Sequence, residues 1–277
     1  MGHTVCFQQN ETEPLPCEYD WVEGVICNGL FLTHDIHKFT NLRYIQLTSA
    51  GFDRIPMDYV NEHNIKIHNA RGVYSIPMAE FAVSGVLQLY KQSRYFYENQ
   101  KVHRWEKHRG LLELYGKTVC IVGCGSVGTE CAKRFAAFGC HIIGIDIAPY
   151  QNEHYHRMEP LEKIDKNLSV SDIVVLTLPL TEHTHHLMNA ERFAQIKTGA
   201  ILINIARGGI VETDALIEAL HEKLYGALID VFEDEPPSER NELWNCGNVI
   251  ITPHNSFVGN GNENRMYECI LINLNGR

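Results

Sequence analysis

Continuous apolar runs alternate along the chain with segments that repeat apolar residues at helical spacing. The runs predict strands buried on both faces, because they are rich in β-branched residues and lack regular polar alternation. They are VEGVICNG (22–29), LRYIQLTS (42–49), KTVCIVG (117–123), CHIIGID (140–146), SDIVVLTLP (171–179), AILINIA (200–206), YGALIDVF (225–232) and NVIITPH (248–254), with a short opening run VCFQ (5–8). Buried parallel strands need covering helices, which the segments 127–139, 161–169, 189–199 and 212–223 predict. The pattern therefore indicates an α/β fold with a doubly wound parallel sheet.

The longest helical pattern runs from about Ile76 to Trp105, and its first half has apolar residues at helical spacing. Only two convincing strands precede Asn69, whereas about six follow Gly116. We therefore expect this helix to open the second and larger of two domains.

A glycine-rich turn follows the predicted strand 117–123 in the sequence VGCGSVG. Its G-x-G-x-x-G pattern consists of Gly123, Gly125 and Gly128, and an amphipathic helix follows. The first glycine permits a tight turn, the second lets the backbone approach a pyrophosphate, and the third permits close helix packing. The N–H groups of Ser126 and Val127 would then face the phosphates at a helix N-terminus.

Asp146 ends the next predicted strand, at the position where a carboxylate accepts hydrogen bonds from ribose hydroxyls. The same carboxylate would repel a 2′-phosphate, and no arginine follows until Arg157, so the sequence favours NAD over NADP. The alternative is that the glycines only turn the chain and Asp146 caps a loop. Cys124, inside the turn, is interpreted as a small filler residue.

Three charged or titratable residues follow other predicted strands: Arg207, Glu235 and His254. Ligands of open parallel sheets bind beyond the carboxyl ends of the strands, so these residues are candidates for a site. Histidine can transfer a proton near neutral pH, a carboxylate can hold its tautomer, and a guanidinium can clamp a substrate carboxylate. Taken singly, each residue also fits an ordinary role as a surface ion-pair partner, a solvated acid or a cap.

The composition excludes several classes of partner. A formal net charge of −10 argues against a general nucleic-acid binder. No apolar run approaches the roughly 20 residues that span a bilayer, and residues 1–14 lack the pattern of a secretory signal, so we expect a cytoplasmic protein with no membrane partner.

The nine cysteines form no CxxC pair and are interpreted as reduced. His183, His185 and His186 crowd together, but a solvated loop or a helix start is favoured over a metal site, and no metal is expected.

Several stretches of the chain, taken together and in the order in which they occur, resemble the D-isomer-specific 2-hydroxyacid dehydrogenases. This family includes phosphoglycerate, glycerate and D-lactate dehydrogenases. They are TSAGFDRI, NARGVYSIPMAE, VGCGSVG with Asp146, LTLPLTEHT, NIARGGIVETDAL, ALIDVFEDEP and TPHNS. The resemblance implies that Arg207 binds substrate and polarises its carbonyl group. It further implies that His254 is the general acid/base and that Glu235 is the carboxylate paired with it.

The resemblance also implies further site residues. Leu178 and Ala206 would line the cofactor cleft, Asp230 would lie near the nicotinamide carboxamide, and the backbone amides around Ala50 and Gly51 would hold the substrate carboxylate.

The resemblance implies a Rossmann domain beside a smaller, flavodoxin-like substrate domain. The substrate domain would comprise residues 1–70 and a C-terminal return at 256–277, with the NAD-binding domain at 71–255. The long helix from Ile76 would help to form a two-fold homodimer.

The chain departs from the family pattern in three places. ETEPLPCEYDW (11–21) leaves little room for the expected first helix, so the substrate domain is expected to be shortened. After the TPH stretch the family more often shows small residues, whereas this chain has Asn255, Ser256 and Phe257. Arg54 and Arg71 are extra cations near the substrate loops; they could select a second acidic group, but a solvated role is favoured.

The expected function is the NAD-dependent interconversion of a 2-oxo acid and a D-2-hydroxy acid. The alternative is a dinucleotide-sensing regulatory protein on the same fold. A sensor needs the glycine loop but not an acid/base pair, so the set of Arg207, Glu235 and His254 favours the enzyme.

Overall fold

The computed structural model describes residues 4–276 of the chain. Residues 1–3 and 277, which begin and end the predicted domain ranges, lie outside the described residues. The chain divides into two compact units, one formed by Met1–Tyr74 with Gly259–Arg277 and the other by Ser75–Val258. Both boundaries of the larger unit fall a few residues later than the predicted range 71–255.

The larger unit is built around a sheet of seven strands, all parallel, in the order β10-β9-β8-β7-β4-β5-β6. The strands are β4 (Thr118–Val122), β5 (His141–Asp146), β6 (Arg157–Pro160), β7 (Ile173–Leu176), β8 (Ile201–Asn204), β9 (Gly226–Ile229) and β10 (Val249–Ile251). The helices are α2 (Ser75–Tyr90), α3 (Ser93–Lys101), α4 (Ser126–Ala137), α5 (Ile164–Leu168), α6 (Ala190–Gln195) and α7 (Thr213–Glu222).

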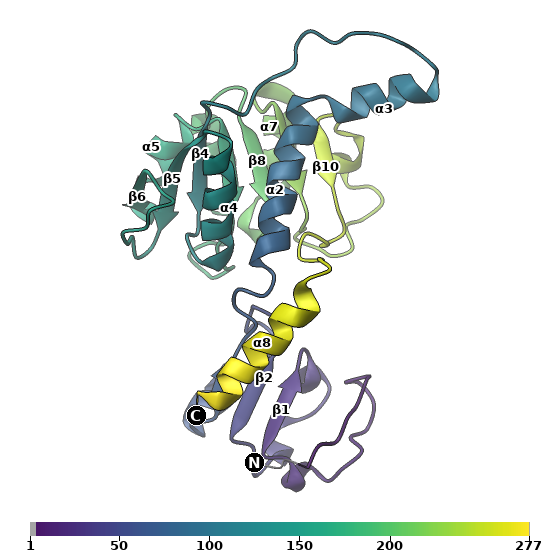
Figure 1. The fold of residues 1–277 in the computed structure, drawn as a ribbon, viewed down its shortest axis with the longest axis vertical. Coiled ribbons are helices and arrows are strands. Elements are labelled where there is room, and N and C mark those ends of the chain that lie inside the picture. Colours follow the sequence, from purple (N-terminus) through teal and green to yellow (C-terminus); the bar gives the residue numbers. More distant parts are fainter. Residues whose placement is uncertain (1–3, 277) are drawn as a thin grey trace. The chain divides into compact units, whose positions relative to one another are not determined.

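Helices cover both faces of this sheet (Figure 1). Val119 and Ile121 of β4 belong to the apolar core under α2 and α4, whereas Cys120 and Val122 belong to the core under α5, α6 and α7. All four side chains are fully buried. A strand that buries both of its faces needs apolar residues at successive positions, which explains the continuous runs in the sequence.

The order of strands reverses between β4 and β7. From β4 the chain moves outward through β5 and β6, and it then returns to the other side of β4 to add β7 to β10. The loops that leave β4 and β7 therefore diverge, which is where ligands of doubly wound sheets bind. The predicted α/β architecture with a second, smaller α/β unit is confirmed.

The smaller unit contains a parallel sheet in the order β1-β2-β3. Its elements are β1 (Gly24–Cys27), β2 (Tyr44–Leu47), β3 (Lys66–His68), α1 (Met57–Glu62) and α8 (Asn262–Asn275). Helix α8 comes from the far end of the chain but is bonded to the first part of this unit. Arg265 Nε donates to the Val73 carbonyl at 2.7 Å, and Asn273 Nδ2 donates to Oε1 of the fully buried Gln46 at 2.9 Å.

The prediction of one helix over residues 76–105 is wrong. Helix α2 ends at Tyr90, and Gln92 adopts a left-handed conformation with φ 53°. The Gln92 side chain donates to the Leu89 carbonyl and to the Tyr225 hydroxyl, so it satisfies the end of α2 and stops its continuation. Helix α3 follows, and the segment after it projects from the sheet without regular structure (Figure 1).

One predicted strand is absent from the structure, and two strands of the structure were not predicted. Residues 5–8 form no strand, and Val5 and Phe7 are exposed. Strands β3 and β6 were not predicted because KIH is very short and RMEP contains two charged residues and a proline.

None of the helices in residues 4–276 combines the length and apolar character needed to cross a membrane.

Ile142 and Ile147 form a matched pair for testing the core, because Ile142 on β5 is fully buried and Ile147 is 83% exposed. We expect Ile142→Ala to lower the free energy of unfolding by about 3 kcal/mol through the lost burial and the cavity that remains. Ile147→Ala should change it by less than about 0.5 kcal/mol. Urea unfolding followed by circular dichroism measures both, and equal losses would contradict this core assignment.

Candidate active site

The glycine turn joins β4 to α4 and leaves no room for side chains at two of its glycines. A Cβ at position 128 would lie 2.1 Å from the Gly123 carbonyl oxygen, and one at Gly123, where φ is +95°, would lie 2.6 Å from the Leu178 nitrogen. A Cβ at Gly125 would meet nothing within 4 Å. Ser126 and Val127 begin α4, so their N–H groups belong to the first helical turn, where intrahelical acceptors are lacking. The turn thus presents open backbone beside a helix N-terminus.

Asp146, the last residue of β5, is bonded to this turn. Its Oδ2 accepts the Cys124 N–H at 2.7 Å, and its Oδ1 accepts the Ala148 N–H at 3.1 Å. The predicted acidic partner therefore lies beside the glycine turn, and it also caps the loop that follows. Burial raises the pKa of the Cys124 thiol to about 12, which agrees with its interpretation as a filler residue.

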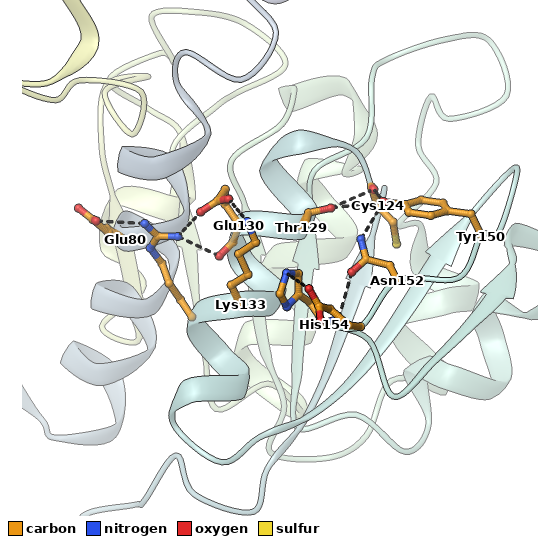
Figure 2. Close-up of polar contacts among 10 residues, drawn as sticks. Glu80, Cys124, Thr129, Glu130, Lys133, Tyr150, Asn152 and His154 are labelled. Atoms are coloured by element: carbon orange, nitrogen blue, oxygen red, sulfur yellow. Dashed lines mark hydrogen bonds and ion pairs between the residues drawn. The ribbon is translucent and has the colours of Figure 1, made fainter. Parts of the chain in front are cut away.

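Two residues that the sequence analysis missed also hold the turn. Thr177, just after β7, donates its hydroxyl to the Gly123 carbonyl at 2.6 Å. Tyr150, in the loop after β5, donates its hydroxyl to the Cys124 carbonyl at 2.7 Å. Figure 2 shows Tyr150 and Thr129 approaching this carbonyl from different elements. Thr177 could have been suspected because it directly follows a buried strand, but nothing in the local sequence marks Tyr150.

Arg207 follows β8 after a short apolar stretch, and the buried Asn204 shapes its backbone. Asn204 Oδ1 accepts the Ala206 N–H at 3.1 Å, and Nδ2 donates to the Arg207 carbonyl at 3.0 Å. The Arg207 guanidinium donates to the Ala206 carbonyl at 2.8 Å and is partly exposed. Arg207 therefore lies just beyond the carboxyl end of the apolar strand β8, at the edge of the sheet.

Glu235 and His254 are brought together, as the resemblance implied. Oε2 of Glu235 lies 2.8 Å from Nδ1 of His254, and Oε1 accepts the Phe232 N–H at 3.1 Å. Their side chains are 38% and 42% exposed, so the pair is open to a ligand. A carboxylate at Nδ1 holds the ring so that Nε2 is the nitrogen available for proton transfer.

Asp230, which is fully buried, organises the turn that carries the histidine. Its carboxylate accepts the Thr252 hydroxyl at 2.6 Å and the N–H groups of Asn255 and Ser256 at 2.8 and 3.0 Å. His254 has a positive φ of 50°, and its N–H donates to the Asp230 carbonyl at 2.8 Å. Such a conformation persists only where the surroundings fix it. Ser256 is thereby buried, while Phe257 packs edge-on to the His254 ring at 6.1 Å between centroids.

Glu233, also missed, fixes the loop that presents Glu235. Its Oε1 lies 2.6 Å from Nε2 of His186, and its Oε2 accepts the hydroxyl and the N–H of Thr213 at the start of α7. Burial alone would raise the pKa of this carboxyl, but the hydrogen bonds from Thr213 and His186 outweigh it and lower the pKa. His186 therefore has a partner in the fold. No group of three or more potential metal ligands occurs among residues 4–276.

The remaining predicted residues occupy both units. Leu178 and Ala206 are buried at the ends of β7 and β8 in the larger unit. Ala50 and Gly51 follow β2 in the smaller unit, where Asn69 Nδ2 donates to the Ala50 carbonyl at 2.6 Å and Ser49 Oγ donates to the Gly51 carbonyl at 3.1 Å. Arg54 and Arg71 lie on the surface of the same unit.

A model of one protein family matches the larger unit. It is described as the D-isomer specific 2-hydroxyacid dehydrogenase, NAD binding domain, and it matches residues 83–256. The chain is 37% identical over 221 residues to the hydroxypyruvate reductase of Thermotoga maritima, a match that covers 77% of this chain and 70% of the relative. It is 36% identical over 234 residues to the D-3-phosphoglycerate dehydrogenase of Methanocaldococcus jannaschii, covering 83% of this chain and 44% of the relative.

Solved structures agree with these matches. The D-lactate dehydrogenase of Aquifex aeolicus, solved with NAD and lactic acid, superposes with a TM-score of 0.76 at 28% identity, covering 92% of this chain and 83% of that one. The chain therefore belongs to the D-isomer-specific 2-hydroxyacid dehydrogenases, a family of NAD-dependent enzymes. It spans less than half the length of the phosphoglycerate dehydrogenase that it matches.

NAD is the cofactor of this family's nucleotide-binding domain, and the glycine turn fits it. The open space at Gly125 leaves room for a pyrophosphate against the backbone, and a carboxylate stands beside the turn at Asp146. The absence of Cβ atoms at Gly123 and Gly128 keeps the turn tight.

Gly128→Ala tests this fit. We expect at least a tenfold loss of NADH affinity, because the new methyl group would push α4 away from the Gly123 carbonyl oxygen. Gly247→Ala is the matched control, since a Cβ there meets nothing within 4 Å. NADH fluorescence titration measures both, and unchanged affinity in the Gly128 variant would argue against the turn as the binding site.

Proposed function

We propose that the protein reduces a 2-oxo acid to a D-2-hydroxy acid, and catalyses the reverse reaction, with His254 as the proton carrier. The observation that carries this proposal is the 2.8 Å contact between Glu235 and the Nδ1 side of His254. Hydroxypyruvate reductase and phosphoglycerate dehydrogenase among the relatives support a short 2-oxo or 2-hydroxy acid as the substrate. A regulatory sensor would have no use for this pair.

Each residue has a distinct role in the proposed reduction. His254 donates its Nε2 proton to the substrate carbonyl oxygen, and Glu235 holds the ring in position. Arg207 binds the substrate carboxylate and polarises the neighbouring carbonyl group. When bound, NADH supplies the hydride that the carbonyl carbon accepts.

We also propose which groups of the larger unit hold NAD. We assign the pyrophosphate to the backbone at Gly123, Gly125 and the start of α4 at Ser126–Val127, and the adenosine ribose to Asp146. Leu178, Ala206 and Asp230 are assigned to the nicotinamide end. The assignment of Ala50 and Gly51 to the substrate carboxylate stays a prediction.

We further propose that two copies of the chain form a homodimer. The support lies on α3 and the segment after it, where Tyr97, Val102 and Trp105 are 58%, 65% and 99% exposed. This segment encloses a hollow of about 820 Å3 whose lining includes Arg104, Lys107 and Arg109. Exposed apolar groups of this kind mark association surfaces.

Turnover of a panel of 2-oxo acids tests the proposed reaction. We expect oxidation of NADH with at least one of glyoxylate, pyruvate, hydroxypyruvate and phosphorylated 2-oxo acids. His254→Ala should lower kcat by about 10²- to 10⁴-fold, the usual contribution of a general acid, and leave NADH affinity within about twofold. His221→Ala, at an exposed position on α7, is the control. Wild-type turnover by the His254 variant would refute the assigned role.

Trp105→Glu tests the homodimer. A buried carboxylate at the centre of an apolar contact costs several kcal/mol, so we expect the variant to sediment as a monomer at micromolar concentration, where the wild type sediments as a dimer. Val170→Glu, at an exposed apolar position before β7, should leave the dimer intact. A dimeric Trp105 variant would place the interface elsewhere.

A further inference from the structure

The peptide groups on either side of Cys124 are each fixed by one residue, Asp146 at the end of β5 and Tyr150 in the loop after it. The Cys124 N–H donates to Asp146 Oδ2 at 2.7 Å, and the Cys124 carbonyl accepts the Tyr150 hydroxyl at 2.7 Å. Thr129 makes a weaker approach to the same carbonyl at 3.5 Å. Tyr150 is itself held, since Thr129 Oγ1 lies 3.3 Å and Asn152 Nδ2 lies 3.4 Å from its hydroxyl oxygen (Figure 2).

These peptide groups need fixing because of their neighbours. Gly123 and Gly125 flank Cys124, and glycine adopts positive and negative φ with similar ease, so a peptide beside it can rotate at low cost. The Cys124–Gly125 peptide is planar and trans, and its N–H therefore points opposite to its carbonyl. Because the Tyr150 hydroxyl holds the Cys124 carbonyl, the N–H of Gly125 points to the side of the peptide opposite Tyr150. At Gly125 a Cβ would meet nothing within 4 Å, so the backbone there is open to a ligand.

We propose that Tyr150 is a positioning residue for the cofactor: its hydroxyl keeps the Cys124–Gly125 peptide oriented so that the Gly125 N–H faces the pyrophosphate. This inference rests on the proposed pyrophosphate site. If the peptide rotated, the Cys124 carbonyl oxygen would face the anionic phosphates, and a favourable contact would become a repulsive one. Tyr150 acts through the backbone and is 46% exposed, so its removal leaves no cavity in the core.

The inference predicts a selective defect in Tyr150→Phe, which keeps the ring and removes the hydroxyl. ADP-ribose contains the pyrophosphate and adenosine does not. We expect the affinity for ADP-ribose to fall about three- to tenfold, the range that one hydrogen bond contributes, and the affinity for adenosine to stay within about twofold. Displacement of bound NADH, followed by fluorescence, measures both affinities without any turnover of substrate.

Tyr115→Phe is the matched control, because Tyr115 is 77% exposed and lies in the same unit. Unchanged affinity of the Tyr150 variant for both probes, or an equal loss for both, overturns the inference; equal loss indicates a general effect on the loop. Gly128→Ala distinguishes failure of the role proposed for Tyr150 from failure of the proposed pyrophosphate site. If Gly128→Ala weakens ADP-ribose binding and Tyr150→Phe does not, the pyrophosphate site stands and the role of Tyr150 falls.

Discussion

The proposed catalytic arrangement depends on a backbone contact between two loops at the end of the sheet. A Cβ at position 208 would lie 1.8 Å from the Phe232 carbonyl carbon, so only glycine allows the loop after β8 to pass the loop after β9 at this distance. Arg207 immediately precedes this contact, and Glu235 follows it by a few residues while bonding back to the Phe232 N–H. Any side chain at position 208 would push the loop that begins at Arg207 away from the loop that carries Glu235.

Carboxylate and carboxamide side chains where loops leave the sheet complete the arrangement. Asn204 determines the backbone before Arg207, Asp230 determines the turn that contains His254, and Glu233 fixes the loop that presents Glu235. In each case the polar side chain bonds backbone N–H or carbonyl groups, or a neighbouring side chain, where a loop leaves the sheet. Preorganisation of this kind lets a partly exposed pair such as Glu235 and His254 keep a defined geometry before substrate binds.

The sequence predicts those parts of the fold that depend on local patterns. Continuous apolar runs identified the buried strands because both faces of the sheet are covered, and the glycine spacing with Asp146 identified the nucleotide turn. The pattern failed at β6, an edge strand with little to bury, and at Gln92, where a side-chain hydrogen bond ends α2. It could not reveal Tyr150, because a tyrosine in a polar loop acquires its role only when the chain folds back to the Cys124 carbonyl.

The smaller unit is assembled from both ends of the chain, and this has a consequence for synthesis on the ribosome. The buried Gln46 and the carbonyl of Val73 obtain hydrogen-bond partners from α8. Domains that are continuous in sequence can complete their contacts as soon as they emerge, whereas these two hydrogen bonds form only after α8 has left the exit tunnel. The larger unit can therefore be complete before Gln46 and the carbonyl of Val73 obtain these partners from α8.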